Sequence, residues 1–268
     1  MIPGSLEATL VLLRHGESVF IAEDRFQGRA ESPLSPLGRR QAALAGSRLS
    51  QPLRSPTLPI PPGPAVEIAH SPLQRATETA AAVAHAFANA GGGIVPLRPD
   101  MGLAEIGQGE WEGLPRADVA SRYGDMLAAW RHQPTRRQAP GGERLVDVDV
   151  RVRSALATVV ATLEGAATAA GVRGTSPASP TAGYPRPASP RTPWSVIVGH
   201  DGAFKVLLLA LFDLPLERFW SFPFGLAAIT IIELRAGQPI LRVHNWTEHL
   251  APLEGDTHPS EGDEQERP

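Results

Sequence analysis

The hydrophobic pattern begins with a short apolar run, residues 8–13, that stops abruptly at Arg14, His15 and Gly16. A continuous apolar run of this length, bounded by polar residues, is typical of a strand that is buried on both faces of a sheet. In open α/β sheets, ligands bind beyond the carboxyl ends of such strands. The run therefore predicts a buried strand that ends at a functional site.

Helical periodicity follows this strand and recurs between the later apolar runs. Apolar residues at spacings of three and four predict a long helix over residues 143–170. Ser35 followed by Pro36 is a typical helix start, with a capping side chain and a proline in the first turn, and it predicts a helix over residues 36–49. The other predicted helices are 71–90, opened by Ser71 and Pro72, 116–130 as one or two short helices, and 203–212; the later predicted strands are 66–69, 94–97, 195–198, 227–234 and 240–244.

Strands and helices alternate along most of the chain, which is typical of a layered α/β domain. We expect a three-layer α/β/α sandwich with a mostly parallel mixed sheet, in one domain over residues 1–253. Residues 171–193 are rich in Pro, Ser, Thr, Ala and Gly and are predicted to be a disordered insert within this domain. Residues 254–268 are polar and acidic and are predicted to be a disordered tail. The polar stretch 19–32 is too irregular to predict a helix.

The composition narrows the function classes. The 268 residues carry a formal net charge of −3, so the overall charge favours neither nucleic acid nor an anionic membrane as a partner. Cysteine is absent, which excludes disulfides, zinc–thiolate sites and cysteine nucleophiles. No apolar run approaches the roughly 18 to 20 residues of a membrane span, and the N-terminus lacks the basic start and apolar core of a signal peptide. A cytoplasmic protein is therefore expected.

Three of the predicted strands end close to residues that can bind an anion. Arg14 and His15 follow the first strand, Arg75 lies shortly after the second, and His200 follows the strand over 195–198. Because parallel strands bring their carboxyl ends to one edge of a sheet, two histidines and two arginines can meet there. Guanidinium groups supply charge and paired donors, and a histidine adds a further donor, which suits a dianionic phosphate.

Metal binding is the competing use of paired histidines. The spacings of His, Asp and Glu match no ligand pattern such as H-E-x-x-H, so no metal site is predicted. No G-x-G-x-x-G follows the first strand, which argues against a dinucleotide-binding fold. His70 is interpreted as structural, and Glu110 and Glu112, on either side of Trp111, are interpreted as surface charges.

Five sequence blocks resemble, in the same order, those of the histidine phosphatase superfamily, also called the phosphoglycerate mutase-like family. The three residues R-H-G alone are a weak signal, whereas five blocks in order are specific. The GEWEG form of the fourth block, together with FPFGLAAITIIEL at residues 222–234, looks most like the broad-specificity and cobalamin-pathway phosphatases. The blocks are LLRHGES (12–18), FQGRAESPLSPLGRRQA (26–42), SPLQRATETA (71–80), LAEIGQGEWEG (103–113) and VGHDG (198–202).

The resemblance implies catalytic or phosphate-binding roles for five residues in these blocks. His15 would be the nucleophile that forms a phosphohistidine, and Glu105 would protonate the leaving alcohol and then help to activate water. Arg14, Arg75 and His200 would bind the phosphoryl oxygens and stabilise the charge of the transition state. Neither a metal nor another cofactor would be needed, since the arginines supply the positive charge.

The substrate loop and two departures from the family pattern complete the prediction. The resemblance assigns Ser18, Gln27 and Gly28 to substrate binding. Ile21 stands where many members carry an asparagine that contacts the phosphate, which implies either another donor or weaker phosphate binding. Asp201 stands where a glycine often follows the second histidine, and this difference bears on the orientation of the helix that comes next.

The expected function is that of a metal-independent phosphatase that hydrolyses small phosphomonoesters through a phosphohistidine. A cofactor-dependent phosphoglycerate mutase and a non-catalytic phosphate-binding module are the alternatives. The expected partner is a small phosphorylated metabolite, and a homodimer is left open. The organic part of the substrate is predicted to contact residues 19–32, the segment 116–137 and Trp111. Arginines of that segment would favour a second acidic group if they line the cleft, and otherwise belong to a solvated face.

Overall fold

The computed structural model describes residues 2–172 and 190–253. The predicted tail, and most of the predicted insert, lie outside these residues, and the domain limits stay a prediction. The helices and strands are β1 (Ala8–Arg14), α1 (Val19–Ala22), α2 (Pro36–Ser50), β2 (Ile68–His70), α3 (Gln74–Asn89), β3 (Leu97–Pro99), α4 (Arg116–His132), α5 (Leu145–Ala169), β4 (Trp194–Gly199), α6 (Asp201–Leu211), β5 (Ile229–Arg235) and β6 (Gln238–Trp246), with short 3-10 helices η1 (Met101–Leu103), η2 (Gly109–Trp111), η3 (Leu216–Ser221) and η4 (Glu248–Leu253).

Within the described ranges the strands form a six-stranded sheet in the order β3-β2-β4-β1-β5-β6. Strands β3, β2, β4 and β1 run parallel to one another, whereas β5 and β6 are antiparallel to their neighbours. Leu12 at the centre of β1 is paired with Ile197 of β4 on one side and with Thr230 of β5 on the other. The mostly parallel mixed sheet is therefore confirmed.

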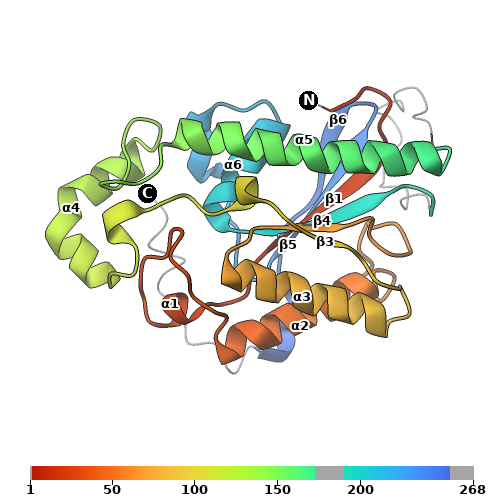
Figure 1. The fold of residues 1–268 in the computed structure, drawn as a ribbon, viewed down its shortest axis with the longest axis horizontal. Coiled ribbons are helices and arrows are strands. Elements are labelled where there is room, and N and C mark those ends of the chain that lie inside the picture. Colours follow the sequence, from red (N-terminus) through yellow and green to blue (C-terminus); the bar gives the residue numbers. More distant parts are fainter. Residues whose placement is uncertain (1, 173–189, 254–268) are drawn as a thin grey trace.

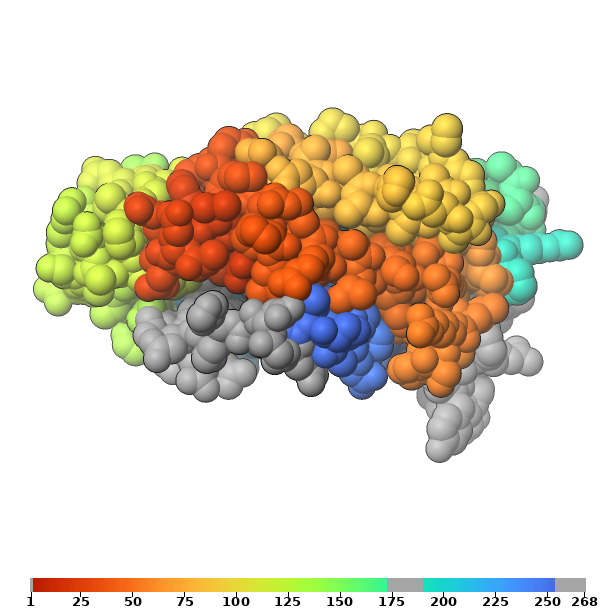
Figure 2. Space-filling model, turned by 90° about the horizontal axis from the view of Figure 1, so that it is seen from below, coloured from red at the N-terminus to blue at the C-terminus, as the bar shows by residue number. Residues whose placement is uncertain are grey.

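Helices cover both faces of this sheet, because successive side chains of a strand point to opposite faces. Along β1, Leu10 and Leu12 belong to one buried cluster with residues of α5 and α6, while Val11 and Leu13 belong to another with residues of α2 and α3. Figure 1 shows α5 and α6 on one side of the sheet and α2 and α3 on the other. Figure 2 views the molecule from the α2–α3 side. The predicted α/β/α layering is confirmed.

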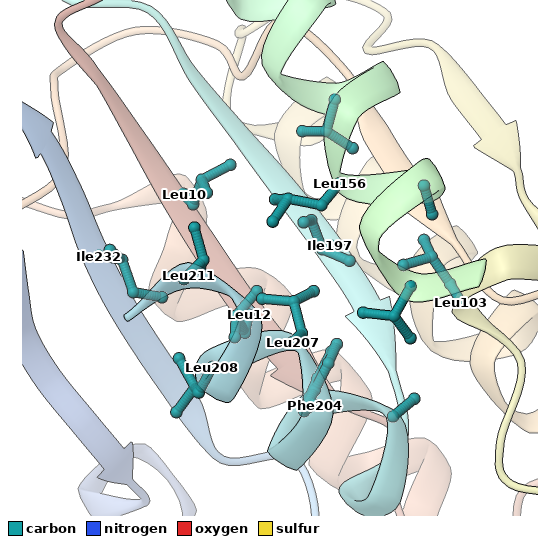
Figure 3. Close-up of a cluster of buried hydrophobic side chains, with 14 of the residues drawn as sticks. Leu10, Leu12, Leu103, Leu156, Ile197, Phe204, Leu207, Leu208, Leu211 and Ile232 are labelled. Carbon is teal, nitrogen blue, oxygen red and sulfur yellow. The ribbon is translucent and has the colours of Figure 1, made fainter. Parts of the chain in front are cut away.

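The cluster on the α5–α6 side anchors the helix that follows β4. Phe204, Leu207, Leu208 and Leu211 of α6 point toward the strands, as Figure 3 shows. Almost every residue of α6 is buried, including the paired Asp201 and Lys205, so this helix is covered on all sides. Burying each of these large side chains contributes about 2 kcal/mol to folding. The packing fixes the start of α6 against the carboxyl end of β4.

Helix α2 begins at its predicted capping residue, whereas helix α3 does not. The hydroxyl oxygen of Ser35 accepts a hydrogen bond from the Gly38 N–H at 3.0 Å, as the predicted start of α2 requires. Helix α3 begins at Gln74 rather than at the predicted Ser71, and its first turn has no capping side chain. The Ser71 hydroxyl lies instead 2.7 Å from Nε2 of His200. The predicted start of α3 was wrong by three residues: the Ser71 hydroxyl contacts a distant histidine, and Leu73 is the N-cap residue.

Two other helices bear on the site. Helix α1, a single turn capped by Ser18, lies in the stretch 19–32, whose pattern was too irregular to predict a helix. Helix α4 is kinked at Tyr123, in agreement with the prediction of one or two helices.

Within residues 2–172 and 190–253, none of the helices combines the length and the apolar character that crossing a bilayer demands.

Candidate active site

His15 lies directly beyond the end of β1, and its ring has a defined tautomer. Its Nδ1 lies 2.6 Å from the carbonyl oxygen of Gly16. Because a carbonyl oxygen only accepts hydrogen bonds, Nδ1 carries the hydrogen and Nε2 keeps its lone pair. A side chain at Gly16 would place Cβ 2.4 Å from the Gly38 carbonyl of α2, so only glycine allows this close approach. The result is a fixed imidazole with Nε2 available as a nucleophile.

Burial and neighbouring cations keep the His15 ring neutral. The side chain is 2% exposed, and burial lowers the pKa of His15 well below its usual value near 6.5. The charges of Arg75 and Arg14 lower this pKa further, while the hydrogen bond to Gly16 opposes them. An uncharged ring is the form that can attack an electrophile.

The second histidine packs against the first. The rings of His15 and His200 meet edge to face, with their centroids 5.0 Å apart. His200 is fully buried, and burial, followed by the charges of Arg75 and Arg14, lowers its pKa well below 6.5. The parallel strands β1, β2 and β4 therefore bring together the residues that the strand ends predicted.

Both arginines are held by backbone carbonyl groups. Nη1 of Arg14 donates to the carbonyl oxygen of Phe224. Arg75 donates to Gly28 at 2.8 Å and to Ala30 at 3.0 Å, so it also shapes the loop that begins at residue 27. Arg75 is fully buried, and burial lowers its pKa to about 10, which leaves it charged at neutral pH. Two cations thus lie beside two neutral histidines.

The Glu105 carboxylate is oriented by three backbone N–H groups. It accepts from Ile106 at 2.8 Å, from Ala203 at 3.1 Å and from Gly202 at 3.2 Å, the last two in the first turn of α6. A Cβ at Gly202 would lie 2.6 Å from Oε1 of Glu105, so a side chain at this position would displace the carboxylate. The α6 packing therefore determines where Glu105 points.

The backbone of Glu105 is held by a network that the sequence analysis missed. Its carbonyl oxygen accepts from Arg151 at 3.0 Å and from Arg29 at 3.2 Å. Glu143 pairs with both arginines. Burial would raise the pKa of Glu143, but Arg151 and Arg29 hold it below its usual value, so the carboxylate stays charged. No sequence pattern joins Arg29 to the other two residues, because it lies 114 positions before Glu143.

Asp201 does not disturb the helix that follows His200. Helix α6 begins at Asp201, with His200 as its N-cap residue. One oxygen of Asp201 accepts from the Phe224 N–H at 3.2 Å, and the other lies 2.5 Å from Nζ of Lys205, which is itself buried. Asp201 therefore holds the backbone of the same residue, Phe224, whose carbonyl oxygen accepts from Arg14.

The structure separates the three predicted substrate-loop residues. Gln27 and Gly28 line the cleft in front of His15, as does Ile21, whose apolar side chain stands where the family pattern has an amide. Ser18 is fully buried and is not among the lining residues; it caps α1 and donates to Oε1 of Gln27 at 2.5 Å. Ser18 thus supports the loop from behind the cleft wall.

Glu112 is not the surface charge that the sequence suggested. Its Oε1 accepts from the N–H groups of Gln108 at 2.8 Å and of Arg29 at 2.9 Å. It ties the substrate loop to the loop of Glu105, and Gly28, at φ of +52°, leaves room for it. Glu110 is exposed, as predicted, and accepts from the Tyr123 hydroxyl at 3.0 Å. The position of Glu112 within the GEWEG motif was the sequence signal that could have pointed to this role.

The cleft is lined by charged and polar residues, among them Arg14, His15 and Glu105, and by aromatic residues. Trp130 of α4 and Phe219 and Trp220 of η3 line the cleft, as do Arg116 and Arg131. The other arginines predicted for this region, Arg122, Arg136 and Arg137, are exposed and do not line the cleft. Within the described part of the chain, no group of three His, Cys, Asp or Glu side chains could hold a metal ion.

The fold and these residues agree with one family. The chain belongs to the histidine phosphatase superfamily (branch 1), whose family model matches residues 10–172 and 187–247. This match includes all five sequence blocks on which the resemblance was based.

Individual relatives extend the comparison. The chain is 33% identical over 211 residues to a glucosyl-3-phosphoglycerate phosphatase of Mycobacterium tuberculosis, covering 78% of each protein. A solved structure of the mycobacterial glucosyl-3-phosphoglycerate phosphatase in complex with VO3 has a TM-score of 0.68 and 27% identity, covering 90% of this chain and all of the other. The chain also matches a bifunctional protein of Mycobacterium tuberculosis with 28% identity over 242 residues, but it spans only about half, 54%, of the length of that relative.

The neutral, buried histidines make stability depend on pH. An unfolded histidine binds a proton as the pH falls through about 6.5, whereas the pKa values of folded His15 and His200 lie well below that. The unfolded state therefore gains protons first, and we expect the free energy of unfolding to decrease as the pH falls below 6.5. In urea titrations at pH 7 and pH 5, His200→Gln should lose less stability than the unchanged protein. An equal loss in both would contradict the prediction.

The Asp201 contact predicts an effect on anion binding that two double variants can isolate. Lys205→Met with Asp201→Asn removes the buried ion pair but keeps an acceptor for the Phe224 N–H, whereas Lys205→Met with Asp201→Leu removes both. If Phe224 positions Arg14, the second variant should bind inorganic phosphate about tenfold more weakly than the first, as expected for a lost hydrogen bond at a charged group. Calorimetric titration measures this ratio, and equal affinities would refute the positioning role.

Proposed function

We propose that this protein is a phosphatase that hydrolyses small phosphomonoesters through a phosphohistidine on His15. The observation that carries the proposal is the state of His15: its Nδ1–H is held by Gly16, its ring is neutral, and two guanidinium groups lie beside it. A neutral imidazole with a free Nε2 is a nucleophile, and the cations offer a place for the phosphoryl oxygens. Membership of the histidine phosphatase superfamily supports the same activity.

The reaction proceeds in two steps on this geometry. Nε2 of His15 attacks phosphorus, the bond from phosphorus to the alcohol oxygen breaks, and the Glu105 carboxyl group gives its proton to that oxygen. Water then attacks the phosphohistidine, Glu105 takes a proton from it, and the bond from phosphorus to Nε2 breaks. Arg14, Arg75 and His200 hold the phosphoryl oxygens throughout. No step requires a metal ion, because the two arginines supply the positive charge.

The cleft supports a substrate whose organic part carries a second acidic group. Arg116 and Arg131 both line the cleft. Arg116 pairs with Asp24 at 3.0 Å, and the carbonyl oxygen of Arg131 accepts from the Trp220 side chain at 2.9 Å. The relative named glucosyl-3-phosphoglycerate phosphatase is consistent with this class, since its substrate name contains a phosphorylated acid. The substrate is thus a small phosphorylated metabolite with a carboxylate. The cytoplasmic location and the homodimer stay predictions.

Substitutions at the two reacting residues test the mechanism. His15→Ala should abolish turnover but leave binding of inorganic phosphate measurable. Glu105→Gln should slow hydrolysis of phosphoserine, a poor leaving group, by two to four orders of magnitude, and that of p-nitrophenyl phosphate far less, because p-nitrophenolate leaves without a proton. Steady-state rates on both substrates measure the difference. A similar loss on both would remove Glu105 from the role of acid.

A substrate panel tests the activity and the class of substrate together. Purified protein should release phosphate from 3-phosphoglycerate and glucosyl-3-phosphoglycerate with a higher kcat/KM than from glycerol phosphate, which lacks the carboxylate. Arg131→Gln should reduce this preference by about tenfold, the value of one charge-assisted hydrogen bond. The exposed Arg136→Gln serves as the matched control. No phosphate release from any member would contradict the proposed function, and transfer of the phosphoryl group between positions of phosphoglycerate would favour the mutase.

A further inference from the structure

Ser71 makes a contact with His200 that the mechanism above does not use. It lies directly beyond β2, and its fully buried hydroxyl oxygen is 2.7 Å from Nε2 of His200, which lies directly beyond the adjacent strand β4. The backbone N–H of Ser71 donates to Val198 at 3.0 Å, and its carbonyl oxygen lies 2.8 Å from Nδ1 of His70. The backbone on both sides of the side chain is therefore fixed, and so is the hydroxyl.

The hydrogens around this hydroxyl can be assigned. The N–H of Leu73 donates to the Ser71 oxygen at 3.3 Å, which occupies one of its acceptor positions. Within the described residues, the only other partner of the hydroxyl is Nε2 of His200. A hydroxyl has one hydrogen to donate, and Nε2 is where that hydrogen can go. With Ser71 donating, Nε2 of His200 is an acceptor and carries no hydrogen.

The other ring nitrogen then carries the hydrogen of the neutral ring. The low pKa of His200 means that the ring has a single N–H, which must be at Nδ1. Nδ1 is buried and has no partner within the described residues, although an unpaired buried donor costs about 1 to 3 kcal/mol. Its ring lies against that of His15, beside the charges of Arg75 and Arg14. A phosphoryl group bound there offers only acceptors, so it can satisfy this donor.

We propose that Ser71 is a positioning residue, which selects the tautomer of His200 in which Nδ1–H donates to a phosphoryl oxygen. The inference rests on the proposed function for the identity of the anion, whereas the tautomer itself does not depend on turnover. Without the serine hydroxyl, nothing described opposes the tautomer with the hydrogen on Nε2. That tautomer would direct a lone pair of Nδ1 toward the phosphoryl oxygens and repel them.

Nitrogen NMR of the histidine rings tests the tautomer directly. With 15N-labelled histidine, and with His200→Gln to assign the signal, the unchanged protein should show a protonated Nδ1 and an unprotonated Nε2 at His200. Ser71→Ala should shift the ring toward the other tautomer, while Ser71→Thr, which keeps a hydroxyl, should restore the original pattern. A protonated Nε2 in the unchanged protein would overturn the proposal.

Binding of inorganic phosphate tests the consequence. Ser71→Ala should weaken phosphate binding about tenfold, the value of one hydrogen bond to a charged group. Ser195→Ala is the matched control: Ser195 is also fully buried, lies in β4, the strand that His200 follows, but near its far end, and has a hydroxyl with no partner within the described residues. This control should keep the phosphate affinity of the unchanged protein. Equal affinities of Ser71→Ala and the control would also overturn the proposal.

The two failures are distinguishable. If the tautomer and phosphate results hold but no substrate is turned over, the proposed function fails and the role of Ser71 stands. If turnover is observed and His200 carries its hydrogen on Nε2, the proposed function stands and the role of Ser71 fails.

Discussion

The rest of the structure depends on how charge is buried at the ends of β1, β2 and β4. Isolated charges in such a place would be costly, so each group needs either neutrality or partners. The two histidines are neutral, because burial and Arg75 lower the pKa of both. The two arginines keep their charge by donating to carbonyl oxygens of loops on both sides of the cleft. The result is a positive, dehydrated corner that an anion completes.

The loops around this corner are rigid for the same reason. Arg75 fixes the substrate loop while it faces the histidines, and Glu112 ties that loop to the Glu105 loop. Glu143 and Arg151 then fasten the Glu105 backbone to the start of α5. Arg75 therefore has two effects: it holds the substrate loop, and its charge lowers the pKa of both histidines. In the proposed reaction, such preorganisation would place donors where charge develops, without reorganisation during the step.

Much of this arrangement follows from the sequence, because it rests on local patterns. Apolar runs identify β1 and β4, and periodicity identifies α5 within two residues of its start. The parallel strands then carry His15 and His200 to one edge of the sheet. The order of the five sequence blocks indicated the histidine phosphatase superfamily, which the family match confirms. Helix α3 shows the limit of such reasoning: a Ser-Pro pair predicts a cap at Ser71, but the helix starts three residues later.

The sequence by itself determined most of the strands and the layers, since these depend on neighbours along the chain, and it named the reacting residues of the proposed mechanism; the predicted strand over 94–97 shares only Leu97 with β3. The tertiary structure alone decided what each polar side chain does. Ser71 binds a histidine 129 positions away instead of capping a helix. Ser18 supports a loop instead of lining the cleft, and Glu112 is a tether instead of a surface charge. Hydrogen bonds are short and directional, so a polar residue's partner is set by which distant segment folding brings within about 3 Å of it.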